Sequence, residues 1–352
     1  MSIYPPLTVL RPPIDEHDDI VMLSDAWNGR TARISRVAML EYVTSKIVER
    51  TPSPLAMEFE SRLSAMWRAD NSRVDPVEIA RARHWLERGW HGSLEYYLWS
   101  RRCKYFDEQD PDANLRREAV ARFLREDGPP QRRVPGGTTV GLSAPGLPTH
   151  DATLGSLLMS RRTIRGYSHR PIEEGLLSSV LWWTLTPVRR IRNMAYLDPV
   201  DYLSSFGTAF DFYVAVYSVD GVATGIHYYD PRQHEMTQIR SGPVRDTLSK
   251  AMFGIPAART ANFTVILCAD FNQASWRYRH DRELRNLYIE AGYLGQRFIL
   301  TGAAYGLATL VTPAIKDREV ASLLSLDAVW QAPMYTITMG MDPRRLALGG
   351  NR

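Results

Sequence analysis

The chain has 352 residues, of which 44% are hydrophobic and 23% charged, so it is long enough for about two globular domains and falls outside the disordered, collagen-like and low-complexity classes. Its longest apolar runs, such as residues 263–269, are far shorter than the ~20 residues of a membrane span, and no signal peptide or anchor is visible, so we expect a cytoplasmic protein without membrane association. The net charge of +4 comes from arginines gathered at a few places, which favours anionic groups bound at defined points over nucleic acid.

The part of the chain before residue 127 is predicted to be helical. Apolar residues recur there at helical spacing, and Asp75-Pro76 has the pattern of an N-cap followed by a first-turn proline. The predicted helices cover residues 37–48, 55–67, 77–86 and 94–99. We therefore predict a small helical N-terminal domain over residues 1–126, followed by a Pro- and Gly-rich linker or surface-wrapping segment over residues 127–150.

The remaining residues, 151–352, mix helices and strands. Segments rich in β-branched and aromatic residues predict strands, and longer segments with helical periodicity predict helices. In chain order the predicted elements are helix 173–183, strand 211–218, a hairpin over 225–239 with an Asp-Pro turn, helix 244–253, strand 264–269, helix 284–305, helix 318–324 and strand 334–341. Runs of neighbouring strands followed by long helices favour an α+β fold over a doubly wound sheet.

The first segment that suggests chemistry is a cluster of arginines, in which Arg161, Arg162 and Arg165 lie close to the hydroxyl of Thr163. Arginine forks match the geometry of phosphate and carboxylate groups, so the cluster is a candidate anchor for a phosphorylated cofactor. A solvated basic loop is the alternative interpretation of the same residues.

Two later segments are also candidates. Residues 204–207, with the sequence SSFG, form a small-residue turn before a strand, where the backbone could approach a flat ring closely; a plain turn is the alternative. Residues 276–282, with the sequence WRYRHDR, combine possible acid/base groups with charges able to shift their pKa values. An exposed helix start capped by Asp281 is the alternative there.

The helix predicted over residues 284–305 contains several glycines and alanines, which allow close approach in a buried core helix or in a dimer interface. Metal and nucleophile chemistry find no support. Cys103 and Cys268 lie far apart, the histidines do not pair at ligand spacing, and no nucleophile elbow, P-loop or HExxH pattern occurs. We therefore predict no bound metal and no disulfide framework.

The order of these motifs resembles the FMN-dependent nitroreductase superfamily. The series begins with RRTIR at Arg161, SSFG at Ser204 and TGIHYYDP at Thr224, and it continues with EAGYLGQ at Glu290, GLAT at residues 306–309 and YTITMG at residues 335–340. It is most similar to the SagB-type peptide dehydrogenase branch, and the resemblance covers residues 151–343. The sequence RGWHGSLEYY at residues 88–97 looks more loosely like the helical extension of some such dehydrogenases.

The resemblance implies a nitroreductase-like α+β fold, with a mostly antiparallel central sheet flanked by helices, in an obligate homodimer that binds FMN at the subunit interface. Arg161, Arg162, Thr163 and Arg165 would hold the phosphate and ribityl chain, and Ser205 and Gly207 would lie beside the isoalloxazine. The rest of the implied cofactor-binding set is Gln296, Thr309, Ala314, and Arg344 or Arg345 after the last strand.

The chain departs from the family pattern at two places. Azoline-oxidising relatives have a Lys-Tyr pair for acid/base chemistry, whereas the most similar place here reads Arg277-Tyr278. Arginine keeps its proton at working pH, so we predict that Tyr278 transfers protons, with Arg277 lowering the pKa of Tyr278 or stabilising an oxyanion. Pro313-Ala314 replaces a Gly-Gly pair near flavin N5, which leaves the Ala314 amide as the donor.

The leading hypothesis is an FMN-dependent oxidoreductase that oxidises a residue of a ribosomally synthesised peptide by two electrons during natural-product maturation. An azoline-to-azole step and the oxidation of an aromatic side chain such as indole both fit. The partners would be a peptide with a leader segment and a cyclase or ligase. One rival is an NAD(P)H-dependent reductase of nitro or quinone compounds, and another is a flavin-free scaffold subunit whose N-terminal helices hold a leader peptide.

Overall fold

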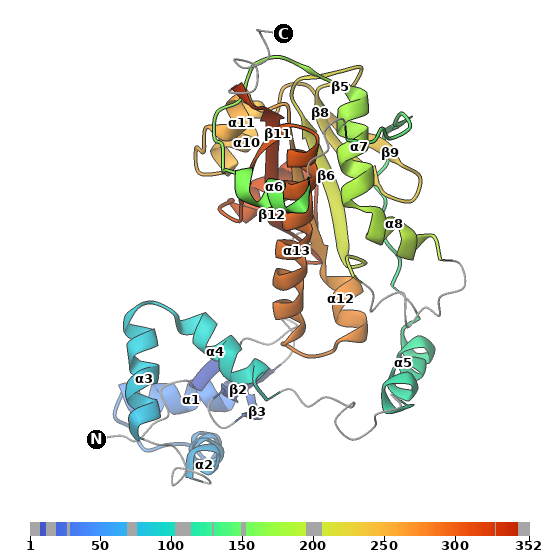
Figure 1. Cartoon of the computed structure of the whole chain (residues 1–352). Helices are drawn as coiled ribbons and strands as arrows, with labels where there is room; N and C mark the ends of the chain where they lie inside the picture. The colour runs from blue at the N-terminus through green and yellow to red at the C-terminus, as the bar shows by residue number, and fades with distance from the viewer. Residues whose placement is uncertain are drawn as a thin grey trace, which may run out of the picture. The chain divides into compact units, whose positions relative to one another are not determined.

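The chain divides into two compact units in a computed structural model (Figure 1). Unit 1 comprises Met1–Tyr105 with His280–Arg282, and unit 2 comprises Phe106–Arg279 with Glu283–Arg352. The structure describes residues 8–11, 19–26, 29–68, 76–102, 114–128, 130–148, 153–194, 206–327 and 329–343.

Unit 1 combines a small sheet with helices. Strands β1 (Thr8–Arg11), β2 (Ile20–Asp25) and β3 (Arg30–Ser35) form an antiparallel sheet in the order β1-β2-β3. The helices that follow are α1 (Arg36–Ile47), α2 (Pro54–Arg68), α3 (Pro76–Glu87) and α4 (His91–Ser100). The four predicted helices are therefore present. Three strands of four to six residues, which were not predicted, precede the helices.

The sheet of unit 1 packs one face against α1 and α2. Its core contains Val21, Leu23, Ile34 and Phe59, with further contacts from the two helices. Strand β3 passes into α1 without a loop, and the Ser35 hydroxyl oxygen caps α1 by accepting a hydrogen bond from the N–H of Ala38 at 3.4 Å. A serine side chain thus ends the strand and starts the helix.

Unit 2 is built on a seven-stranded antiparallel sheet. The strand order is β11-β12-β10-β6-β8-β9-β4. The strands are β4 (Thr138–Gly141), β6 (Phe210–Val216), β8 (Gly225–Asp230), β9 (Glu235–Ser241), β10 (Phe263–Asp270), β11 (Leu307–Thr312) and β12 (Gln331–Met341). A short parallel pair, β5 (Ile172–Glu173) and β7 (Val219–Asp220), stands apart from it.

Helices cover both faces of this sheet. The helices of unit 2 are α5 (Asn114–Glu126), α6 (Leu154–Ser160), α7 (Glu174–Thr184), α8 (Thr186–Arg192), α10 (Arg245–Ala251), α11 (Ala257–Thr260), α12 (Phe271–Arg277), α13 (Glu283–Ala304) and α14 (Asp317–Leu324). Along β6, Phe210, Phe212 and Val214 pack with α7 and α13, whereas Tyr213 and Ala215 pack with α10 and α14. The α+β prediction is confirmed.

The segment predicted as a linker or surface wrap belongs partly to this sheet. Within residues 130–148, β4 pairs with β9 at the sheet edge. The guanidinium of Arg132 forms an ion pair with the fully buried carboxylate of Asp211, and it also donates to the carbonyl oxygens of Thr208 and of Phe210, the latter at 3.1 Å. The segment is thus fastened to the sheet immediately beside residue 207.

Candidate functional site

The arginine cluster follows α6 and is attached to strand β11. Thr163 forms an isolated parallel bridge with Thr309, and the N–H of Ile164 donates to the Thr309 carbonyl oxygen at 3.3 Å. Arg161 is the C-cap residue of α6, so the arginines begin where the helix ends. Two residues of the predicted cofactor-binding set, Thr163 and Thr309, are therefore neighbours in space.

The guanidinium groups of Arg161 and Arg162 contact neighbouring residues of the same segment. Arg161 donates to the Thr163 hydroxyl at 3.3 Å, and Arg162 donates to the carbonyl oxygens of Met159 and Arg161 at 3.0 and 2.8 Å. Within the described parts of the chain, none of Arg161, Arg162 and Arg165 forms an ion pair with a carboxylate. Guanidinium groups without a carboxylate partner, held at the edge of a sheet, form a donor set suited to phosphate.

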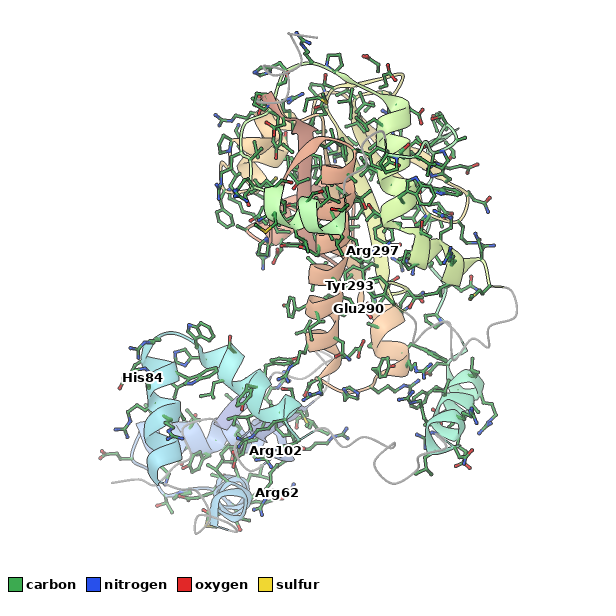
Figure 2. All side chains as sticks on the ribbon, viewed as in Figure 1. Arg62, His84, Arg102, Glu290, Tyr293 and Arg297 are labelled. Atoms are coloured by element: carbon green, nitrogen blue, oxygen red, sulfur yellow. The ribbon has the colours of Figure 1, made fainter. Side chains whose placement is uncertain are left out.

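A second group of predicted residues lies at the N-terminal half of α13. Gly207 has φ of +74°, and a Cβ atom there would lie 2.6 Å from the side chain of Val188, so the position requires glycine. The Gly207 N–H donates to Glu290 Oε2 at 3.4 Å, and the ring of Phe206 meets the ring of Tyr293 edge-on at 4.8 Å. Glu290 and Tyr293 lie close together on α13 in Figure 2. Ser205 lies outside the described residues.

Two carboxyl groups on α13 have perturbed acidity. Burial raises the pKa of Glu290, and the hydrogen bond from Gly207 partly opposes the shift. Burial also raises the pKa of Glu283 to about 7; the hydrogen bond from Asn286 at 2.9 Å lowers it, the charge of Glu290 raises it and that of Arg277 lowers it. These carboxyl groups were missed as acid/base candidates, although their spacing of two helical turns was visible in the sequence.

The predicted catalytic pair stands at the end of α12. Asp270 caps this helix by accepting hydrogen bonds from the N–H groups of Asn272 and Gln273 at 3.0 and 3.1 Å. Arg277 is buried, and its guanidinium lies 5.5 Å from the centre of the half-buried Tyr278 ring. The charge of Arg277 lowers the pKa of the Glu283 carboxyl, so Arg277 lies near the N-terminal half of α13, which Gly207 contacts through Glu290.

The two groups of site residues are separated along α13. A Cβ atom on Gly302 would lie 3.0 Å from Thr309 Cγ2, which places Thr309 beside the C-terminal part of the helix. Gly207 contacts Glu290 near the other end. At a rise of 1.5 Å per residue, the helix keeps these two contacts about 18 Å apart.

The remaining residues predicted to bind the cofactor join neither of these two groups among the described residues. Gln296 is exposed on α13 between the two groups. The Ala314 N–H, predicted to donate to the cofactor, donates to the Thr312 hydroxyl at 2.9 Å. Arg344 and Arg345 lie outside the described residues.

Small residues of α13 pack mainly within the chain. A Cβ atom on Gly295 would lie 2.5 Å from the Tyr335 ring, and one on Gly302 would lie 3.0 Å from Thr309. The N-terminal half of α13 carries exposed apolar side chains, namely Tyr288, Ile289 and Tyr293, with exposures of 59%, 63% and 55%. The helix therefore packs against its own sheet at Gly295 and Gly302, and it exposes apolar side chains in its N-terminal half.

Two absences apply to the described residues. None of their helices combines the length and apolar character of a membrane span, and no cluster of three or more His, Cys, Asp or Glu side chains is arranged to hold a metal ion.

The chain is similar in sequence to a known protein family and to a protein of a bacterial toxin operon. Residues 158–341 match a family described as "Nitroreductase family". Over 266 residues, which cover 73% of each chain, the chain is 26% identical to "Trifolitoxin operon protein TfxC" of Rhizobium leguminosarum bv. trifolii.

Solved structures are also similar. A candidate nitroreductase from Anabaena variabilis shows 23% identity and a TM-score of 0.49 over 62% of this chain, but the match spans only 46% of that longer chain. A chain in the Escherichia coli microcin synthetase McbBCD complex with truncated pro-MccB17 bound shows 17% identity and a TM-score of 0.41, covering 66% of this chain and 93% of that one.

Proposed function

This chain belongs to the nitroreductase family, and we propose that it is an FMN-dependent oxidoreductase that removes two electrons from a residue of a ribosomally synthesised peptide during natural-product maturation. The observation that carries the proposal is the arginine cluster, which β11 holds in place and which no carboxylate neutralises among the described residues. The toxin operon of the rhizobial relative supports the maturation role.

The residues present fit a flavin mononucleotide. Arg161, Arg162 and Arg165 would hold the phosphate by charge-assisted hydrogen bonds, and Thr163 would contribute a hydroxyl. At the other group, Gly207 offers a backbone without a side chain, and its position is held by the Glu290 carboxylate. Bound FMN would supply two-electron redox chemistry.

The separation of the two groups supports a homodimer. One chain keeps its arginine cluster about 18 Å from its own Gly207 segment, measured along α13. A second copy that covers the exposed side chains of Tyr288, Ile289 and Tyr293 would bring its Gly207 segment toward the first copy's arginines. Each cofactor site would then be completed by both chains.

Proton transfer is assigned to residues near the end of α12. Arg277 cannot act as a base because a guanidinium stays protonated. Tyr278 is the proposed proton-transfer residue, and the buried Arg277 provides a fixed positive charge beside its ring. Glu283 is the second candidate, because its pKa of about 7 suits proton exchange at neutral pH.

The purified protein tests the proposal directly. We expect a flavin absorbance spectrum with about one FMN per chain, and bleaching of that spectrum by the peptide substrate in the absence of oxygen. Rapid bleaching by NADPH together with no bleaching by peptide would instead identify a reductase of nitro or quinone compounds. A colourless protein that binds no added FMN would identify a scaffold subunit.

A further inference from the structure

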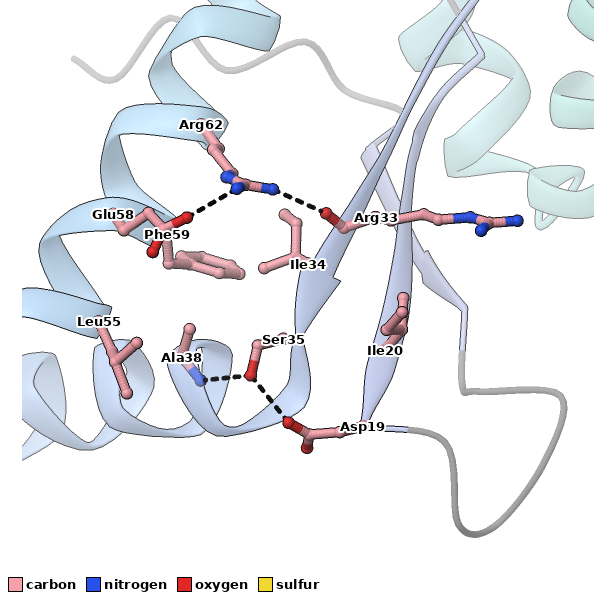
Figure 3. Close-up of a pocket in the computed structure, with 10 residues that line it drawn as sticks. All are labelled: Asp19, Ile20, Arg33, Ile34, Ser35, Ala38, Leu55, Glu58, Phe59 and Arg62. Carbon is pink, nitrogen blue, oxygen red and sulfur yellow. Dashed lines mark hydrogen bonds and ion pairs between the residues drawn. The ribbon is translucent and has the colours of Figure 1, made fainter.

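Unit 1 contains a groove that the oxidoreductase chemistry does not use. The groove runs between strand β3 and helix α2, with a cavity of about 350 Å³ (Figure 3). The residues that line it are Asp19, Ile20, Arg33, Ile34, Ser35, Ala38, Leu55, Glu58, Phe59 and Arg62. The volume is within the range of specific ligand sites, so the groove is large enough to take side chains from a bound molecule.

One wall of the groove is the outer edge of β3. Strand β3 pairs with β2 on one side, and no other described strand pairs with it. The register places Arg33 opposite Met22 and Ile34 opposite Val21. The N–H of Arg36 donates to the Asp19 carbonyl oxygen at 2.6 Å, so Arg36 and Asp19 form a hydrogen-bonded pair. Hydrogen-bonded and non-hydrogen-bonded pairs alternate along an antiparallel ladder, so Arg33 and Met22, three positions further along, form a non-hydrogen-bonded pair. The main-chain N–H and C=O of Arg33 therefore point away from β2.

A side chain already uses this outward edge. Arg62 Nη1 donates to the carbonyl oxygen of Arg33 at 3.2 Å, and Arg62 Nη2 is held by Glu58 at 2.7 Å (Figure 3). The guanidinium N–H thus occupies the place where the N–H of a further strand would donate. The Arg33 N–H has no hydrogen-bond partner among the described residues.

The other wall is one face of α2, which carries two apolar and two charged side chains. Leu55, Glu58, Phe59 and Arg62 recur at helical spacing, so all four lie on the side of α2 that faces β3. In Figure 3 the side chains of Phe59 and Ile34 point toward each other, whereas that of Arg33 points away. A strand added to β3 would place every second side chain on the face of Ile34, against Leu55 and Phe59.

We propose that this groove binds an extended segment of the peptide substrate, which adds a fourth strand to the sheet at β3 and buries apolar side chains at alternate positions against α2. This inference rests on the proposed function, because that function supplies a peptide as the occupant. Main-chain pairing with an exposed edge is a general mode of peptide binding, in which hydrogen bonds give affinity and side-chain pockets give specificity. The segment that binds the groove does not include the residue that is oxidised.

The test uses the full-length protein loaded with FMN. The probes are fluorescein-labelled synthetic peptides that overlap to cover the short open reading frames flanking the gene, and fluorescence anisotropy measures binding. We expect at least one peptide to bind, with apolar residues alternating in its sequence. Arg33→Pro removes the outward N–H but spares the ladder to β2, and it should weaken binding roughly tenfold or more. The matched control Arg33→Ala keeps the N–H and should bind within about twofold.

A second variant makes the result independent of the proline. Leu55 is 41% exposed in the groove wall, so Leu55→Glu should fold normally and also weaken binding roughly tenfold. Peptide binding should slow amide hydrogen exchange at residues 31–35 of the unmodified protein. Circular dichroism and flavin content should stay unchanged in all three variants.

Several outcomes would overturn the groove assignment. They are the absence of binding by every peptide, equal losses in Arg33→Pro and Arg33→Ala, full binding by Leu55→Glu, or unchanged exchange at residues 31–35. A shift from dimer to monomer in Arg33→Pro would instead identify the edge as a contact between copies and would also overturn it. Failure of the proposed function would give a different result: the protein would bind peptide, but it would either contain no flavin or contain flavin that the peptide does not reduce.

Discussion

The main sheets of the two units differ in how completely they are covered. Every residue of β6 and of β10 in unit 2 is buried, because helices cover both faces of that sheet. In unit 1, Ile34 is the one buried residue of β3, and the strand keeps an outer edge beside a groove. A sheet covered on both faces holds reactive groups at fixed positions, whereas an exposed edge can accept another chain. We interpret unit 2 as the chemical part and unit 1 as the part that captures peptide.

The largest effect expected from this division is on turnover. Tyr278→Phe should slow flavin reduction by substrate ~10²–10⁴-fold, the usual contribution of general acid/base catalysis, and should leave peptide binding by unit 1 unchanged. Arg277→Lys should keep substantial activity because it retains a cation. Stopped-flow absorbance without oxygen measures the step. Reduction of Tyr278→Phe at the unmodified rate would remove this residue from the mechanism and favour Glu283.

The second effect is on the stability of unit 2. Arg132→Ala leaves the carboxylate of Asp211 buried without its cation, which should cost about 3–5 kcal/mol in the free energy of unfolding. The neighbouring Arg133 is 73% exposed in its pair with Asp327, so Arg133→Ala should cost less than about 1 kcal/mol. Urea unfolding followed by fluorescence compares the two. Similar midpoints for both variants would show that the segment around residue 132 is not an integral part of the sheet.

The third effect is on cofactor affinity. Arg161→Ala combined with Arg165→Ala should weaken FMN binding at least tenfold, because charge-assisted hydrogen bonds contribute roughly 1.5–3 kcal/mol each. The matched control removes two exposed arginines of unit 1, Arg81 and Arg83, and should leave FMN affinity unchanged. Fluorescence titration of FMN into the apoprotein gives both constants. Full retention of flavin by the first double variant would exclude this cluster as the phosphate anchor.

The smallest effect concerns pH. The pKa of Glu283 is raised to about 7 in the folded chain, above its ordinary value of 4.5, so the folded state binds more protons between these values. Stability should therefore fall as pH rises from about 4.5 to 7. The expected decrease in the free energy of unfolding is no more than about 1 kcal/mol, because solvent screens this partly exposed group. Glu283→Gln should abolish the decrease. Melting temperatures at pH 5 and pH 8 measure it. Parallel pH profiles for the variant and the unmodified chain would contradict the assignment.

Long, regular elements could be predicted from the sequence, and short ones could not. The helix predicted over 284–305 appears as Glu283–Ala304, and the strand predicted over 264–269 appears as Phe263–Asp270, because each repeats its apolar pattern over enough residues. By contrast, β4 has only four residues in a Pro- and Gly-rich segment, and its pairing with β9 is a tertiary contact. The strands of unit 1 were also missed, and each has only four to six residues.

The site was predictable in composition but not in arrangement. The order of motifs from RRTIR to YTITMG predicted the nitroreductase family, and the match over residues 158–341 confirms it. The acidity of Glu283 and Glu290 depends on burial that only the packed helix creates. The separation of Gly207 from Thr309 likewise depends on contacts with opposite parts of α13, which the sequence does not reveal.

The regularity of α13 limits which changes in chain length the protein can accept. Gly207 contacts Glu290, and Thr309 lies beside Gly302. One residue inserted between Glu290 and Gly302 would rotate the Glu290 contact by about 100° around the helix axis relative to the Gly302 contact, and would shift it by about 1.5 Å along the axis. Substitutions on the exposed face leave this relation intact, whereas a single insertion or deletion breaks it. Tolerance of substitution and tolerance of insertion should therefore differ sharply within the same 22-residue helix.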